Sequence, residues 1–234
     1  RKEFVANVSH ELRTPLTNVR TYAETLRDAQ GDIPQATANS FLDIIITETD
    51  RMTHIVQDLL TLSRLDRGDA ELVLSRFPFA EAIQSVVRSS ALNAQQRGHE
   101  LSCGDLSHLP LIVGDRSRLE QVMVNILGNA IKYTPNGGHI RVSAGCEEDT
   151  VWMQVWDDGI GIPEKDRERI FDRFYRVDKA RSRESGGTGL GLSIAREIVQ
   201  RHHGVIALIP HDGPGTTIRM TLPISQGRSG RTED

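Results

Sequence analysis

The hydrophobic pattern divides the chain into a helical first part and a mixed second part. When each residue is placed on a helix of about 3.6 residues per turn, the apolar residues of the first segment fall in one stripe. Gly, Asp and Pro interrupt the pattern at residues 31–34, and a second helical run follows. The first stripe comprises Phe4, Val8, Leu12, Pro15, Val19, Ala23 and Leu26, and the second comprises Phe41, Ile44, Ile45, Met52, Ile55, Leu59, Leu62 and Leu65.

Two long helices joined by a short turn form an αα-hairpin, which cannot bury both apolar stripes well by itself. Pairing with a second copy into a four-helix bundle is the natural solution. We therefore expect residues 1–67 to form a homodimer.

From about residue 70 the pattern alternates between short strands and helices. Two alternating segments, 140–144 and 151–155, flank a polar turn and predict a β-hairpin, and we expect 205–209 to pair with 217–222. This alternation favours an α+β layered sandwich over residues 68–225, followed by a disordered tail at 226–234. The other predicted strands are 73–77 and 111–113, and the predicted helices are 80–96, 119–133 and 192–202.

The composition is that of a soluble globular protein, with 38% hydrophobic and 26% charged residues. A net charge of −4 argues against non-specific nucleic-acid binding, which requires a basic surface. Cys103 and Cys146 lie far apart and form no CxxC pair, so we expect two ordinary thiols. The sequence has neither a signal peptide nor a membrane span, and it starts inside a helical pattern. We interpret it as a cytoplasmic piece of a longer protein.

His10 lies almost opposite the apolar stripe of its helix, with Thr14 beside it. The imidazole should therefore face solvent, next to the carboxylate of Glu11, which is suited to accept its proton while the other nitrogen attacks phosphorus. Pro15 removes a backbone hydrogen bond one turn later and is expected to kink the helix. An ordinary solvated polar face is the alternative explanation, so this motif alone is suggestive of a nucleophile but not decisive.

Asn125 and Asn129 are four residues apart, so they share one face of the predicted helix 119–133. Amide oxygens are acceptable ligands for Mg²⁺, which also binds phosphates directly. Lys132 adds a positive charge for phosphate, and Tyr133 adds a flat ring for a base. Taken alone, an asparagine pair on a helix usually faces solvent and has no binding role.

Asp157 stands at the end of a predicted strand, where its carboxylate can accept a hydrogen bond from the exocyclic amine of adenine. Gly159 and Gly161 follow it and let the backbone approach a ligand closely. A plain glycine-rich turn is the alternative.

A second glycine-rich segment leads into the helix at 192–202, and backbone N–H groups at such a helix start can bind an anion. It is neither a Walker A loop nor a Rossmann fingerprint. Its candidate nucleotide-binding residues are Gly187, Thr188, Gly189, Leu190 and Gly191.

Residues 177–185 are polar and dense in charge, with glycines at the far end, which is typical of a mobile lid. Phe171 and Phe174 precede this segment as packing anchors. Arg176 could reach the terminal phosphate, where a guanidinium neutralises the transferred charge.

In this order the motifs resemble the H, N, G1 and G2 boxes of the bacterial sensor histidine kinases, and residues 171–176 resemble their F box. Residues 174–183 are most similar to the PhoR and WalK type. The resemblance covers residues 2–223. It implies a dimerisation and histidine-phosphotransfer domain at 1–67 and a Bergerat-fold (GHKL) ATP-binding domain at 68–225.

The resemblance also implies a role for each site residue. His10 is the phosphoacceptor, Glu11 is its base, and Thr14 places the water that dephosphorylates a partner. In the ATP site it implies Asn129 as the Mg²⁺ ligand, Asn125 near the phosphates, Lys132 on phosphate or ribose, Tyr133 near adenine, Asp157 on the adenine amine, and Gly159, Gly161, Gly187, Gly189 and Gly191 as the residues that shape the pocket.

The predicted function is autophosphorylation of His10 from ATP, transfer to an aspartate of a response regulator receiver domain, such as that of an OmpR-like transcription factor, and dephosphorylation of that regulator. The resemblance implies a full-length protein anchored in the bacterial membrane, with this core on the cytoplasmic face. An ATP-driven conformational scaffold of the same ATPase fold is the main alternative, and a coiled-coil adaptor is another. The scaffold does not need the exposed His10–Glu11 pair, and ATP binding by the isolated protein would refute the adaptor.

Overall fold

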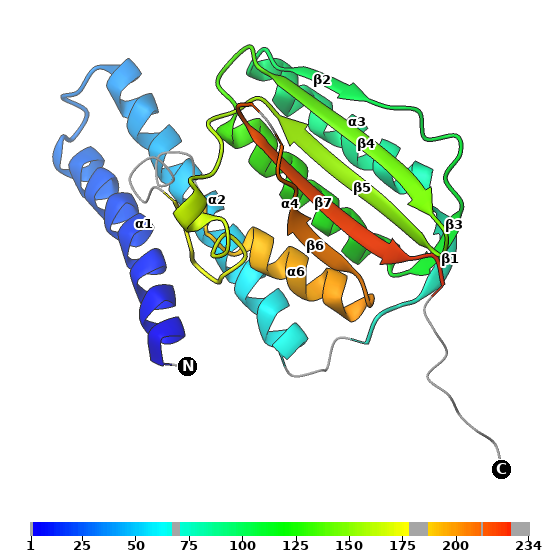
Figure 1. Cartoon of the computed structure of the whole chain (residues 1–234). Coiled ribbons are helices and arrows are strands. Elements are labelled where there is room, and N and C mark those ends of the chain that lie inside the picture. The colour runs from blue at the N-terminus through cyan, green and yellow to red at the C-terminus, as the bar shows by residue number, and fades with distance from the viewer. Residues whose placement is uncertain (1, 67–70, 178–186, 212, 226–234) are drawn as a thin grey trace. The chain divides into compact units, whose positions relative to one another are not determined.

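The computed structural model describes residues 2–66, 71–177, 187–211 and 213–225 (Figure 1). These residues form two compact units. The helical unit contains α1, α2, Gly187 and Thr188, and the sandwich unit contains the remaining described elements. The predicted tail at 226–234, most of the predicted lid and the predicted boundary at residue 67 lie outside the described residues. No described helix combines the length and apolar character that crossing a membrane requires.

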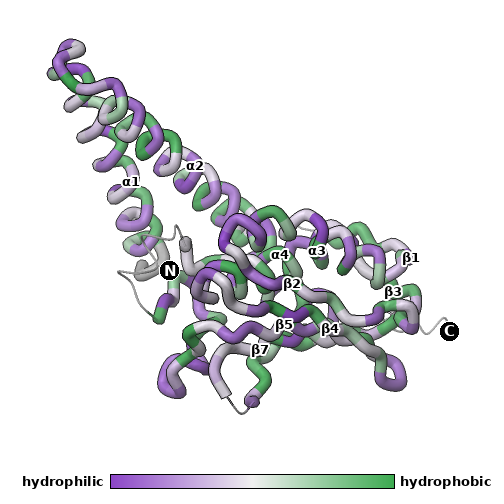
Figure 2. Tube along the Cα trace, turned by 90° about the horizontal axis from the view of Figure 1, so that it is seen from above, coloured by the Kyte–Doolittle hydropathy of each residue, from purple (hydrophilic) through white to green (hydrophobic). Residues whose placement is uncertain are grey.

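The helical unit is the predicted hairpin of α1 (Lys2–Asp28) and α2 (Gln35–Asp66). Helix α1 continues through Pro15, which is buried. Hydrophobic and hydrophilic positions follow each other in short runs along both helices (Figure 2). Ala23 is exposed, contrary to its predicted place in the buried stripe, because one neighbouring helix covers only part of a wide apolar stripe. Large apolar side chains also stay exposed: Val5, Leu16, Leu42, Ile46, Val56 and Leu60.

The sandwich unit is built on a five-stranded sheet with the order β2-β4-β5-β7-β6. The β4–β5 and β6–β7 pairs are antiparallel, which confirms both predicted hairpins. Only β2 and β4 pair in parallel within this described sheet. The strands are β2 (Glu100–Cys103), β4 (His139–Glu147), β5 (Thr150–Asp157), β6 (Val205–Leu208) and β7 (Thr216–Pro223).

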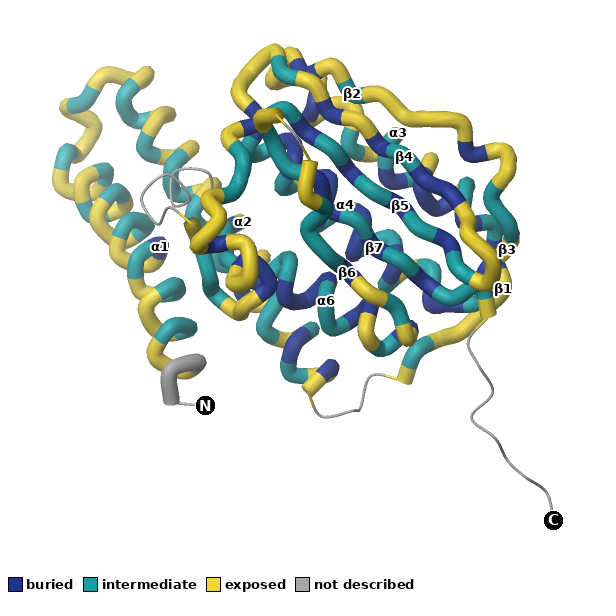
Figure 3. Tube along the Cα trace, viewed as in Figure 1, coloured by how far each residue is buried: buried dark blue, intermediate teal, exposed yellow. Residues whose placement is uncertain are grey.

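Three helices cover one face of this sheet: α3 (Phe79–Gln96), α4 (Arg116–Tyr133) and α6 (Gly191–Arg201) (Figure 1). Alternate residues of β5 are buried, as expected for a strand with one face packed on helices. A separate two-stranded sheet joins β1 (Ser75–Pro78) to β3 (Leu111–Gly114), and the short 3₁₀ helix η1 (Glu164–Asp166) follows β5. Buried positions are concentrated where the helices meet the sheet (Figure 3). The predicted α+β sandwich is therefore confirmed.

A buried histidine connects two of these helices. His202 is fully buried, its Nδ1 lies 2.8 Å from the carbonyl of Ile198, and its Nε2 accepts a hydrogen bond from the Asp115 N–H at 2.9 Å. Asp115 is also the N-cap of α4 and accepts from the Arg118 N–H at 3.1 Å. Burial lowers the pKa of His202. The neutral ring therefore ties the end of α6 to the start of α4.

Candidate functional site

The phosphoacceptor candidate lies on the exposed side of α1. His10 is exposed, as its position opposite the apolar stripe predicts. Thr14 lies one turn further on, and its hydroxyl donates to the carbonyl oxygen of His10 at 3.4 Å. These two side chains therefore share one side of the helix.

The side chain of Glu11 lies between the helices instead, with an exposed fraction of 12%. Its Oε2 is 3.5 Å from Nη2 of Arg51 on α2. The sequence analysis did not identify Arg51 as a candidate residue, although its position in the apolar stripe of α2 could have indicated it. It lies seven residues after Ile44 and four before Ile55, so a charged residue interrupts the apolar stripe of α2.

In the sandwich unit, two neighbouring carboxylates at the end of β5 have different environments. Asp157 is 5% exposed and accepts the Gly159 N–H at 3.0 Å, and burial raises its pKa to about 6. Asp158 accepts from His139 through both its backbone N–H and ring Nδ1, at 2.7 and 2.8 Å. Although partial burial opposes the shift, these hydrogen bonds lower the pKa of Asp158. Of these two carboxylates, Asp157 combines burial with a raised pKa, as a ligand-binding carboxylate does.

Gly159 lies over three oxygen atoms, so a side chain has no room there. A Cβ at this position would lie 2.7 Å from Asp157 Oδ1 and from the carbonyl oxygen of Tyr133, and 3.1 Å from Thr134 Oγ1. The Thr134 hydroxyl is buried without a hydrogen-bond partner. Because Gly159 has no side chain, the end of α4 and the Asp157 carboxylate can lie close together here.

The candidate residues on α4 extend from the start of α6 to the loop after β5. Asn125 donates from Nδ2 to the carbonyl oxygen of Gly191 at 2.9 Å, so it connects α4 to the start of α6. Asn129 is half-buried on the same face. The Lys132 ammonium lies 5.0 Å from the centroid of the Tyr133 ring. The carbonyl of Tyr133 accepts the Ile160 N–H, which ties this end of α4 to the Asp157 loop.

The second glycine-rich segment divides between the two units. Gly189 has φ +72°, and a Cβ there would lie 2.8 Å from the backbone of Phe174, whose N–H donates to the Gly189 carbonyl. Leu190 is buried at the start of α6, next to Gly191. Gly187 and Thr188 belong instead to the helical unit, where the Thr188 hydroxyl donates to Asp58 Oδ2 at 3.0 Å.

Other candidates lie at the edges of the described chain. Arg176 is half-buried, and Gly161 takes a left-handed conformation with φ +71°. Lys179 and Arg181 of the predicted lid at 177–185 could also reach the terminal phosphate or simply face solvent, and both lie outside the described residues. Within the described part of the chain, no group of three or more His, Cys, Asp or Glu side chains could hold a metal ion.

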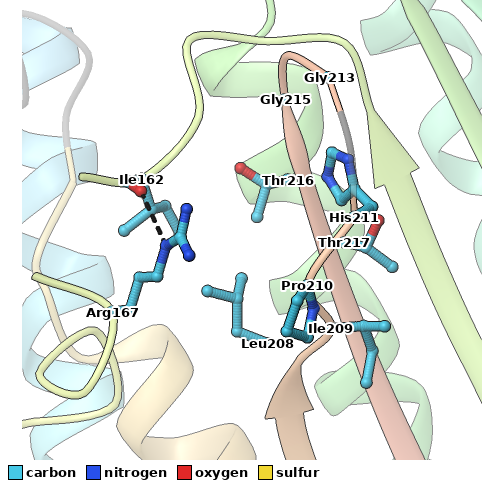
Figure 4. Close-up of a pocket in the computed structure, with 10 residues that line it drawn as sticks. All are labelled: Ile162, Arg167, Leu208, Ile209, Pro210, His211, Gly213, Gly215, Thr216 and Thr217. Atoms are coloured by element: carbon cyan, nitrogen blue, oxygen red, sulfur yellow. Dashed lines mark hydrogen bonds between the residues drawn. The ribbon is translucent and has the colours of Figure 1, made fainter. Parts of the chain in front are cut away.

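A small cavity of about 40 Å³ lies between the segment after Gly161 and the β6–β7 end of the sheet (Figure 4). Arg167 lines it and donates from Nε to the carbonyl of Ile162 at 3.3 Å. Thr216, also in the lining, is the register partner of Asp157, so the cavity borders the candidate adenine site. Ligand pockets typically measure about 300–1,000 Å³, so this cavity can accommodate only part of a nucleotide.

The chain matches two families over most of its length. Residues 1–68 match the His Kinase A (phospho-acceptor) domain, and residues 114–226 match the Histidine kinase-, DNA gyrase B-, and HSP90-like ATPase. The sensor histidine kinase WalK of Bacillus subtilis is 44% identical over 229 residues, which cover 97% of this chain and 37% of that protein. A WalK of Staphylococcus aureus is 39% identical, over 95% of this chain and 54% of its own. This chain thus spans about a third to a half of these relatives.

Solved structures show the same fold. The histidine kinase ThkA in complex with the response regulator protein TrrA matches with a TM-score of 0.79 and 26% identity, over 97% of this chain and 62% of that one. The Acinetobacter baumannii histidine kinase AdeS matches with a TM-score of 0.71 and 24% identity, over 92% of this chain and 98% of its own.

Proposed function

Since this chain belongs to the sensor histidine kinase family, we propose that it is the catalytic core that transfers the γ-phosphoryl group of ATP to His10. The observation that carries the proposal is the exposed imidazole of His10, adjacent in α1 to the carboxylate of Glu11. A scaffold driven only by ATP binding has no need of this pair.

In the proposed reaction, one imidazole nitrogen of His10 attacks the γ-phosphorus while Glu11 accepts the proton of the ring. A nitrogen–phosphorus bond forms, the bond from phosphorus to the bridging oxygen breaks, and ADP leaves. An aspartate of a receiver domain then attacks the phosphorus, the nitrogen–phosphorus bond breaks, and the ring takes back the proton from Glu11 to give neutral His10. A response regulator as partner is supported by ThkA, whose structure contains one.

The nucleotide site is proposed around the buried carboxylate of Asp157, which would accept the adenine amine. The buried Thr134 hydroxyl beside Gly159 has no hydrogen-bond partner in the protein and could bond to a ligand at this site. Mg²⁺ supplies charge neutralisation for the phosphates, and we propose the amide oxygen of Asn129 as its protein ligand. Lys132 would add a fixed positive charge for phosphate or ribose, and Tyr133 a flat surface near the base.

The other residues proposed for this site lie around the second glycine-rich segment. Asn125 would support the phosphate end through its bond to Gly191, and Arg176 would face the terminal phosphate. The proposed backbone contacts come from Gly161, Gly187, Thr188, Gly189, Leu190 and Gly191.

We also propose that the active form is a homodimer. The exposed apolar side chains of α2 fall on one side of the helix, which is the arrangement that a four-helix bundle buries. In the full-length protein we propose a position at the cytoplasmic face of the bacterial membrane and a regulator of the OmpR-like class.

The test is labelling with γ-labelled ATP and Mg²⁺. We expect a label on the wild-type protein that is acid-labile and alkali-stable, as a phosphoimidazole is. His10→Gln should remove it while changing ADP affinity by less than about twofold, because His10 is not among the residues proposed to bind nucleotide and most of those belong to the sandwich unit. A His10→Gln protein that labels at the wild-type rate would refute the assignment.

Dephosphorylation of the regulator is a second proposed activity, with Thr14 as the residue that holds the attacking water. Its support is the shared position of Thr14 and His10 on one side of α1. Thr14→Ala should keep most autophosphorylation and lose most of the stimulated decay of phosphorylated regulator. Equal decay rates with wild type and Thr14→Ala would leave Thr14 with a structural role only.

A further inference from the structure

A polar cluster replaces apolar packing inside the helical unit. Glu11 and Asn18 of α1 meet Glu48 and Arg51 of α2. Asn18 donates from Nδ2 to Glu48 Oε1 at 2.7 Å, and Arg51 Nη1 lies 3.7 Å from Glu48 Oε2. The exposed side-chain fractions are 9% for Arg51, 12% for Glu11 and 14% for Glu48. One guanidinium therefore serves two carboxylates, each almost removed from water.

The contacts of Arg51 are loose for a buried ion pair. Its distances to the two carboxylates are 3.5 and 3.7 Å, and its Nε has no hydrogen-bond partner. A charge-assisted N–H···O bond normally measures about 2.7–2.9 Å. An arrangement optimised for stability alone would use shorter, bidentate contacts, because a buried ion pair repays its desolvation only with excellent geometry. The Arg51 guanidinium therefore lies close enough to orient the Glu11 carboxylate, at a distance longer than that of an optimal charge-assisted bond.

In the proposed reaction, the Glu11 side chain needs a fixed orientation and a nearby positive charge. A glutamate side chain has several rotatable bonds, and fixing it costs conformational entropy. A carboxylate that is nearly buried without a cation would also be strongly disfavoured as an anion. Arg51 answers both requirements, since it orients the side chain and compensates its charge one residue away from His10.

We infer that Arg51 is a positioning residue for autophosphorylation: it holds the carboxylate of Glu11 of the same chain between α1 and α2, so that Glu11 can accept the proton of His10. This inference rests on the proposed kinase function. The competing explanation is that the cluster only fixes the register of α1 against α2. That role would affect the stability of the hairpin but not the rate of a folded protein.

The experiment measures the autophosphorylation rate of the whole chain at varied ATP concentrations, with folding and dimerisation checked by circular dichroism and light scattering. General acid–base catalysis contributes about 10²–10⁴-fold, so Arg51→Met should lower kcat at least about tenfold. The KM for ATP should change less than about twofold, because Arg51 acts on Glu11 and not on nucleotide. Arg51→Gln, which is also neutral but polar, should show the same loss and serves if the methionine variant does not fold.

Two further variants complete the test. Arg51→Lys keeps one cation between the carboxylates and should recover kcat to within about threefold of wild type, although an ammonium lacks the fork geometry of arginine. Arg20→Met removes an exposed arginine of α1 that pairs with Glu24, and it should leave kcat unchanged.

The outcomes separate the two proposals. A wild-type protein that does not label His10 would refute the proposed function itself. If the wild type labels normally, a folded Arg51→Met or Arg51→Gln dimer with wild-type kcat would show that Arg51 is structural. A loss that appears as a raised KM would assign Arg51 to nucleotide binding instead, which also contradicts the inference.

Discussion

The helical unit and the sandwich unit bury their residues in different ways. In the sandwich unit, large apolar side chains such as Phe79, Met123 and Met153 are fully buried. In the helical unit, Ile46 and Leu60 remain 58% and 53% exposed, while the inside of the hairpin contains a polar cluster. The sandwich therefore covers its own core, whereas the hairpin leaves large apolar side chains on its surface.

This difference shows where each part of the chemistry can be placed. A buried carboxylate such as Asp157 keeps its raised pKa because rigid packing excludes water around it. A phosphoacceptor must instead be reached by two different partners in turn, and His10 lies on an exposed helix side. Three changes test this contrast, beginning with the largest expected effect.

Placing charges on the exposed apolar side of α2 should separate the dimer. Leu42→Glu combined with Ile46→Glu puts two unpaired charges where a second copy would pack, and each such charge costs several kcal/mol. We expect the dissociation constant to rise at least about 100-fold. Analytical ultracentrifugation measures it, with Thr47→Glu, on the polar side of α2, as the matched control. An unchanged dissociation constant in the double variant would contradict the bundle.

Removing the buried carboxylate of the sandwich unit should weaken nucleotide binding by about tenfold or more, since a hydrogen bond to a charged group contributes about 1.5–3 kcal/mol. Asp157→Ala should also lose the preference for ADP over GDP, as calorimetry would show. Because the pKa of Asp157 is about 6, wild-type affinity should fall as pH drops below that value and the carboxyl group becomes protonated. Asp157→Asn should remain flat across about pH 5–8, and a parallel fall in that variant would argue against titration of Asp157.

The smallest effect concerns His202 and the stability of the sandwich. Burial lowers the folded pKa of His202 below its ordinary value of 6.5, so the unfolded chain takes up the proton first as pH falls. The stability contributed by the neutral ring is therefore complete above about pH 6.5 and is lost as pH falls through the folded pKa. Its slope is at most about 1.4 kcal/mol per pH unit.

Urea unfolding of the sandwich unit at several pH values measures this slope, and His202→Gln should flatten it. His139 has the opposite dependence, because its hydrogen bond to Asp158 raises its pKa, so the comparison is made between wild type and variant. Identical slopes in the two proteins would show that His202 does not titrate as its burial implies.

Local periodicity was enough to predict most of the fold. The β4–β5 hairpin and the helix ending at Tyr133 follow from short-range patterns, and both are observed. The start of α4 was placed too late, at residue 119, because the prediction began at the first apolar residue and not at the N-cap Asp115. Strand β2 was missed because most of its residues are exposed and its partner β4 is distant in sequence.

The site shows a similar division. The glycines around Asp157 and the exposed position of His10 agree with what the motifs predicted, although the roles of these residues stay predictions. Arg51 was not found because the pattern was read for apolar residues, and a charge inside the stripe passed as an interruption. Its partner Glu11 lies 40 residues away, so only the folded hairpin reveals the contact.

The lengths of the strands have a consequence for how the sandwich behaves in concentrated solution. The central strands β4, β5 and β7 contain nine, eight and eight residues, whereas the edge strands β2 and β6 contain four each. A short edge strand leaves few unpaired backbone N–H and C=O groups with which another chain could form hydrogen bonds. Natural sheets use short edge strands in this way to avoid aggregation. Because both edge strands are short, the sheet resists the addition of further strands. Association of this protein through the edges of its sheet is therefore disfavoured relative to association through its helices.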